Sequence, residues 1–106
     1  MTLKTFLKKD HAASTVKIYL FEINHFIVYL GKGKASEAKY KDIINYVHFL
    51  RKQYQNARTV HRIIQAIKQY YFFLIEIKKR EDHPCRSLQI KLHDNAIQIQ
   101  DLLLEK

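Results

Sequence analysis

The sequence predicts an all-α domain, in which four helices form a bundle and an extended C-terminal linker follows. The 106 residues include two glycines and one proline, whereas a sheet-rich domain of this length would need many more tight turns. Apolar residues recur at steps of three and four along four separate stretches, the spacing of one face of a helix. Hydrophobic residues make up 47% of the chain, enough for a core without metals or disulfides.

The first two predicted helices cover about residues 2–10 and 14–31. The first sets apolar side chains on one side and lysines on the other. The second begins at Ser14 and Thr15, which are good N-cap residues, and ends at Gly31, a common helix stop. An apolar stripe with helical spacing runs along this second segment.

The other two predicted helices cover about residues 40–54 and 57–80. Asp42 in the first turn of the third helix complements the helix dipole. The fourth helix closes with basic residues before Pro84, which enforces the stop. No strand is expected in residues 1–83, and the loosely alternating residues that follow Pro84 read as a strand or an extended linker.

The fourth helix carries two different faces. One face is apolar, and no acidic residue occurs between Ala57 and Ile75. A face that is merely soluble usually mixes charge signs, although a solvated face is the plain alternative. Long basic and amide side chains are the groups that reach phosphates and base edges in a major groove. The polar face consists of Arg58, His61, Arg62, Gln65, Lys68 and Gln69.

Charge points to a polyanionic partner. Nineteen Lys and Arg residues stand against ten Asp and Glu residues, a net charge of +9, and such an excess most often serves nucleic acid. No apolar run approaches the roughly 20 residues that a membrane span needs, so no membrane partner is expected. A single cysteine, Cys85, indicates a reducing compartment, and we expect a cytoplasmic, nucleoid-associated protein.

No catalytic constellation is recognisable in the sequence. His83, Cys85 and His93 match no tetrahedral metal spacing, and Gly31 and Gly33 lack the rest of a phosphate-binding loop. The seven tyrosines lie at core spacing or on helix flanks, with no converging cations that would activate one of them. We therefore expect no catalytic residue, no metal, no cofactor and no small-molecule substrate.

The order of these signals resembles a known family. A short Phe-Leu helix comes first, then a Ser-Thr helix start, then Lys-Asp-Ile-x-x-Tyr at 41–46, then Arg-Thr-Val-x-x-x-Ile at 58–64. Together they resemble the N-terminal core-binding (SAM-like) domain of phage integrases and other tyrosine recombinases, over about residues 3–92. His83 stands where that family often has asparagine before the proline.

The resemblance implies a division of the chain at residue 92. Residues 1–92 would form the DNA-binding core-binding domain, and residues 93–106 a linker and the truncated start of a catalytic domain that is not present. The stretch from Gln100 to Glu105 resembles the leucine- and acid-rich helix that opens that later domain. The catalytic residues of the family lie there, so this fragment would not itself be an enzyme.

The resemblance also implies a function and a site. It implies sequence-directed binding of double-stranded DNA as the N-terminal arm of a site-specific tyrosine recombinase, which positions a separate catalytic domain for DNA integration or recombination beside other recombinase protomers. The alternative is a non-enzymatic helical protein-interaction domain or accessory factor. In the family the second and fourth helices face the major groove, which selects Ser14, Thr15, Lys17, Arg58, Thr59, His61, Arg62, Gln65, Lys68 and Gln69.

Overall fold

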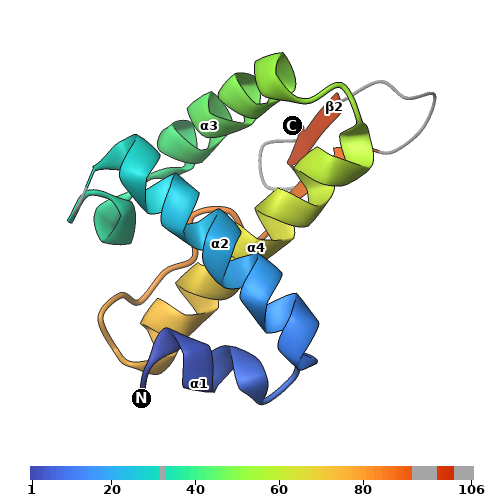
Figure 1. Ribbon diagram of the computed structural model, residues 1–106. Helices are drawn as coiled ribbons and strands as arrows, with labels where there is room; N and C mark the ends of the chain where they lie inside the picture. The colour runs from blue at the N-terminus through green and yellow to red at the C-terminus, as the bar shows by residue number, and fades with distance from the viewer. Residues whose placement is uncertain (32, 92–97, 102–106) are drawn as a thin grey trace.

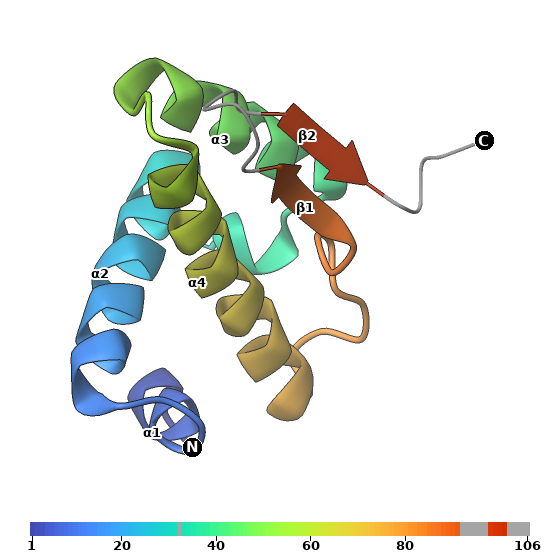
Figure 2. The ribbon, with the colours of Figure 1, turned by 90° about the vertical axis from the view of Figure 1, so that its right-hand side faces the viewer.

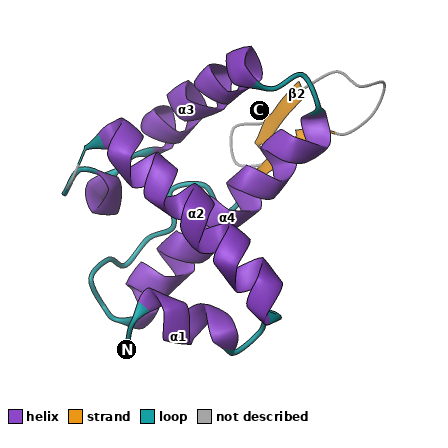
Figure 3. Cartoon of the chain, viewed as in Figure 1, coloured by secondary structure: helices purple, strands orange, loops and turns teal. Residues whose placement is uncertain are grey.

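Four helices and a short hairpin follow one another along the chain in the computed structural model, which describes residues 1–31, 33–91 and 98–101 (Figures 1 and 3). The predicted four-helix fold is confirmed, and within the described part of residues 1–83 there is no strand. The elements are α1 (Leu3–Lys8), α2 (Ala13–Leu30), the 3-10 turn η1 (Ala35–Glu37), α3 (Tyr40–Gln53), α4 (Ala57–Glu76), β1 (Leu88–Lys91) and β2 (Gln98–Asp101).

Helix α4 is the centre of the arrangement. It crosses α2 (Figure 1) and lies between α2 and the β1–β2 hairpin when the molecule is turned by 90° (Figure 2). Ten of its twenty residues are buried. Nine of them, all but Ala57, form one hydrophobic core with residues of α2 and α3 that include Phe26 and Val47, which leaves the polar face of α4 outside it.

Both long helices differ at their ends from the sequence prediction. The N-cap of α2 is Ala12, without a side-chain hydrogen bond, so the prediction that Ser14 and Thr15 cap this helix is wrong. Helix α4 stops at Glu76 rather than near residue 80. It stops there because Lys78 adopts a left-handed conformation with φ of 60°, which closes the helix while its last carbonyl groups remain hydrogen-bonded.

The segment after α4 folds back onto the bundle through Arg80 and His83. The Arg80 guanidinium donates to the Ser36 carbonyl oxygen at 3.2 Å and lies over the buried Tyr71 ring. The backbone N–H of Cys85 donates to Nδ1 of His83 at 3.2 Å, which leaves Nε2 to donate to the Lys68 carbonyl oxygen at 3.0 Å. Burial lowers the pKa of His83 to about 4, so this histidine is neutral at neutral pH.

The hairpin is the main feature that the sequence did not predict. Strand β1 falls in the segment expected to be a strand or linker, but its antiparallel pairing with β2 was not foreseen. Leu88 and Ile90 are buried in the core, with the exposed Gln89 between them. Gln100 and Asp101 lie in β2 rather than in the helix suggested by the resemblance, and residues 92–97 and 102–106 lie outside the described residues.

Candidate nucleic-acid interface

The polar face of α4 keeps its basic side chains at the surface. Arg58 and Arg62 are exposed, whereas the other predicted residues on this helix are half-buried: Thr59, His61, Gln65, Lys68 and Gln69. The start of the helix is fixed by Asn56, whose side-chain oxygen accepts the backbone N–H of Arg58 at 2.8 Å. With the exception of Thr59, these residues occupy about one third of the helix circumference at 100° per residue.

The first turns of α2 supply the other predicted residues. Ser14 and Lys17 are exposed and Thr15 is half-buried. Lys17 and Arg62 line the same surface hollow, which has a volume of about 330 Å³. The crossing of the two helices therefore brings together two groups that lie more than forty residues apart in the sequence.

Glu22 of α2 is the site residue that sequence reasoning missed. The face is free of acids along α4, but the fold places the Glu22 carboxylate against it, with Oε2 3.4 Å from Nη2 of Arg62. The side chain of Glu22 is 7% exposed, and that of Arg62 is 50% exposed. Position 22 lies beside the apolar stripe that includes Ile23 and Phe26, and a carboxylate at such a flank requires a cationic partner, which is the signal that could have found it.

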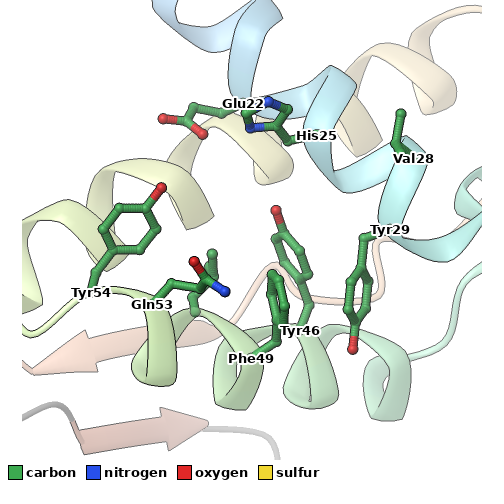
Figure 4. A pocket seen from close by; sticks show the side chains of 9 residues that line it. Glu22, His25, Val28, Tyr29, Tyr46, Phe49, Gln53 and Tyr54 are labelled. Atoms are coloured by element: carbon green, nitrogen blue, oxygen red, sulfur yellow. The ribbon is translucent and has the colours of Figure 1, made fainter.

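A second hollow, lined by aromatic rings, lies on the other side of Glu22 (Figure 4). It has a volume of about 310 Å³ between α2 and α3, and Tyr29, Tyr46, Phe49 and Tyr54 contribute rings to it. The hydroxyl groups of Tyr46 and Tyr54 point toward the Glu22 side of the hollow (Figure 4). Burial, and then the negative charge of Glu22, raise the pKa of Tyr46 to about 12, so the Tyr46 hydroxyl stays uncharged at neutral pH.

Large apolar side chains of α2 are exposed. Ile18, Phe21 and Val28 are 42%, 59% and 71% exposed. Ile18 and Phe21 line the hollow that Lys17 and Arg62 share. This exposed apolar surface is the observation that favours the alternative of a protein-interaction domain, because such patches often mark contact sites.

The described residues offer no other evident chemistry. Among them, no three His, Cys, Asp or Glu side chains lie close enough together to hold a metal ion. Within the same part of the chain, every helix is too short or too polar to cross a membrane. What the described residues do offer is a basic surface, built from one face of α4 and the start of α2.

Comparisons with known proteins define the class. The family described as "Phage integrase, N-terminal SAM-like domain" matches residues 3–78, well over half of the chain. The chain belongs to this family, and the resemblance predicted from the sequence is confirmed.

One curated relative of this chain is named as a tyrosine recombinase. The protein named "Putative tyrosine recombinase TTE1313" of Caldanaerobacter subterraneus subsp. tengcongensis is 32% identical to this chain over 83 residues. The matched region covers 74% of this chain and 29% of the relative, so the chain spans less than a third of the relative's length. No solved structure matches the chain.

Proposed function

We propose that this chain binds double-stranded DNA in a sequence-directed way, as the N-terminal arm of a site-specific tyrosine recombinase. The observation that carries the proposal is the crossing of α2 and α4, which sets Lys17 and Arg62 around one hollow beside the basic polar face of α4. Membership of the integrase family supports DNA as the polyanion that the net charge of +9 would attract.

The proposed contacts divide into positioning and reading. Arg58 and Lys17 lie near helix starts, where side chains and free backbone N–H groups can meet phosphates together. Arg62 and Gln65 lie further along the α4 face, where they would reach base edges if the helix enters the major groove. Thr15, Thr59, Lys68 and the remaining members of the predicted set complete this surface.

The wider role extends beyond this chain. This domain would bind one side of a duplex. It would thereby position a separate catalytic domain, which belongs to the rest of a longer recombinase, for DNA integration or recombination. Other protomers of the same recombinase would be its protein partners. The protein would act in the cytoplasm, in association with the nucleoid.

Binding at several salt concentrations tests the proposal. The duplex is obtained by selecting the strongest binders from a random-sequence pool, and affinity is followed by fluorescence anisotropy. Arg62→Ala and Gln65→Ala should each cost about 1–3 kcal/mol on the selected duplex and relax its sequence preference. Lys17→Ala and Arg58→Ala should weaken binding to every sequence and lower the salt slope by about one.

Two controls make the result decisive. Each variant is first checked for folding by circular dichroism, because Arg62→Ala also leaves the buried Glu22 carboxylate without its partner. Lys39→Ala removes the same charge from an exposed position before α3 and should change binding less than Lys17→Ala. If folded Arg62→Ala and Gln65→Ala proteins bind the selected duplex like the wild type, this face does not read DNA.

The alternative function, a protein-interaction domain, predicts that binding of the partner depends little on salt. A protein partner docked on the exposed apolar side chains of α2 would be held mainly by burial of nonpolar surface, which depends little on salt. Ile18→Ser together with Phe21→Ser would then abolish binding of that partner. A duplex affinity that falls steeply with salt and depends on Arg58 and Lys17 favours the DNA-binding function.

A further inference from the structure

We infer that Glu22 is a positioning residue for Arg62, and that the pair sets how strongly this chain prefers one DNA sequence over another. The inference rests on the proposed function, because it concerns the same face of α4. It assigns to an acidic residue of α2 a part in recognition that neither the charge pattern nor the family resemblance pointed to.

The first support is the environment of the Glu22 carboxylate. The side chain is 7% exposed, between the hollow that holds Lys17 and Arg62 and the hollow lined by aromatic rings. Within the described residues, Arg62 donates a hydrogen bond to this carboxylate and forms an ion pair with it. A buried carboxylate is costly without a cationic partner, so Glu22 favours the conformations of Arg62 that keep the two groups together.

The second support is the geometry of the Arg62 guanidinium. It meets Glu22 through one nitrogen, Nη2, at 3.4 Å, and half of its side chain remains exposed. A guanidinium carries five N–H donors, so a single contact leaves most of them available. Ile18 and Phe21 line the same hollow and give the aliphatic part of Arg62 an apolar surface to lie along.

The third support is the balance of charge. A carboxylate beside the groove-facing helix repels phosphate oxygens, so it penalises arrangements in which Arg62 simply pairs with the nearest phosphate. An arginine that is already held in place loses less side-chain entropy when it donates two parallel hydrogen bonds to a base edge. Glu22 would therefore weaken binding to arbitrary DNA and favour the base that fits Arg62, which is discrimination by repulsion as well as attraction.

Two simpler roles for Glu22 make different predictions. If Glu22 only competed with DNA for Arg62, its removal would strengthen binding to all duplexes equally. If Glu22 only stabilised the fold, its removal would lower stability and leave the ratio of affinities unchanged. Both simpler roles leave unchanged the ratio of the dissociation constant for a scrambled duplex to that for the selected duplex, so a change in this ratio separates the positioning role from them.

The experiment compares Glu22→Gln with the wild type and with Glu37→Gln. Glu37 lies exposed in η1 and does not line the hollow that Lys17 and Arg62 share, so its replacement makes the same change in net charge outside the proposed site. We expect Glu22→Gln to lower the affinity ratio by about tenfold, through weaker binding to the selected duplex together with tighter binding to the scrambled one. Glu37→Gln should leave the ratio at the wild-type value.

A double-mutant cycle links the effect to Arg62. Arg62→Lys keeps the positive charge but loses the planar fork that makes bidentate contacts, so it should lower the ratio about as much as Glu22→Gln does. In the double variant the affinity ratio should fall little further than in either single variant, because both changes remove the same positioned guanidinium. Fully additive losses would overturn the inference.

Other outcomes also decide the question. An affinity ratio that stays at the wild-type value in folded Glu22→Gln overturns the inference, and so does equal tightening on both duplexes. If Glu22→Gln does not fold, Glu22→Asp keeps the charge but withdraws the carboxylate by one methylene, and an unchanged ratio in that variant overturns it as well.

The wild-type chain separates this inference from the proposed function. If the wild type binds no duplex, the proposed function has failed. If it binds duplex DNA but shows no preference for the selected sequence, DNA binding stands and the positioning role is overturned. A wild type that prefers the selected duplex, with Glu22 variants that keep the preference, overturns the positioning role alone.

Discussion

At the scale of single residues, His83 shows how burial fixes a protonation state. The ring contacts Phe72 and Tyr71 and is hydrogen-bonded on both nitrogens, to the N–H of Cys85 and the carbonyl oxygen of Lys68. Protonation of Nδ1 would remove the acceptor that Cys85 uses. The folded state therefore favours the neutral form of the His83 ring, and burial lowers the pKa of His83 to about 4.

This pKa predicts a loss of stability in mild acid. An unfolded histidine has a pKa of about 6.5, so below that pH the unfolded state binds a proton that the folded state does not. The contribution of His83 is complete above about pH 6.5 and is lost progressively as the pH falls toward 4. The urea midpoint, measured between pH 7 and pH 5, should decrease.

Two histidine variants check the assignment. His83→Asn carries the residue that the family often has at this position and should flatten the pH dependence between 7 and 5. His48→Asn, at an exposed position of α3, should keep the wild-type dependence. An equally steep loss in His83→Asn would show that other groups cause it.

At the scale of elements, the end of α4 stores strain at one residue. The N–H of Lys79 donates to the Leu74 carbonyl oxygen at 2.9 Å, and the N–H of Lys78 donates to that of Ile75 at 3.0 Å. This closing pattern requires a left-handed residue at position 78, where glycine is usual. Lys78 adopts φ of 60° instead.

Lys78→Gly should therefore stabilise the domain. A left-handed conformation destabilises the folded state by about 1–2 kcal/mol at a residue other than glycine, and Lys78→Gly would relieve this strain. Glycine also has more conformational freedom in the unfolded state, which offsets about 0.5–1 kcal/mol of the gain. The free energy of unfolding should rise by about 0.5–1 kcal/mol on balance, measured by urea denaturation. Lys79→Gly, one residue further, lacks the positive φ and should not stabilise. A lower stability of Lys78→Gly would contradict this explanation.

The hairpin gives a second prediction at this scale. Leu88 of β1 is fully buried in the same core as α4, so β1 belongs to the folded unit rather than to a free linker. Leu88→Ala should lower the free energy of unfolding by about 2–5 kcal/mol. Gln89→Ala, at the exposed position between the two buried residues, is the matched control and should have little effect. Equal stabilities of these two variants would mean that β1 is not part of the core.

The elements also show what the sequence could and could not predict. The helices followed from periodicity, because nearly every core residue of α2, α3 and α4 recurs at three- or four-residue steps within its own helix. The β1–β2 pairing did not, since it joins two short segments whose register depends on contacts made after folding. The end of α4 was misjudged because basic residues at 78–80 suit a helix end whether or not they are helical.

For the candidate site, the same limit applies to Glu22. The α4 face and Lys17 could be chosen from sequence because charge and spacing are local properties. The acidic neighbour of Arg62 comes from another helix, forty residues earlier, and becomes visible only when the crossing of α2 and α4 is known.

At the scale of the whole molecule, the chain should bind DNA without cutting it. The family that it matches is the N-terminal SAM-like domain of phage integrases, and Tyr46, Tyr70 and Tyr71 are buried, which raises the pKa of each hydroxyl. Purified protein incubated with supercoiled plasmid should give no nicked product and no covalent protein–DNA adduct on a denaturing gel. A covalent adduct lost in Tyr54→Phe, which alters a partly exposed tyrosine, would reveal a nucleophile in this chain.

The crossing of α2 and α4 has one more consequence. Each helix has a direction of its own, and two helices that cross together fix the orientation of whatever lies against both of them. A duplex that touches the start of α2 and the polar face of α4 could not be turned end for end without exchanging the groups that meet each strand. Its recognition sequence would therefore be asymmetric. Two such sequences on one DNA molecule could be distinguished as being in direct or in inverted orientation.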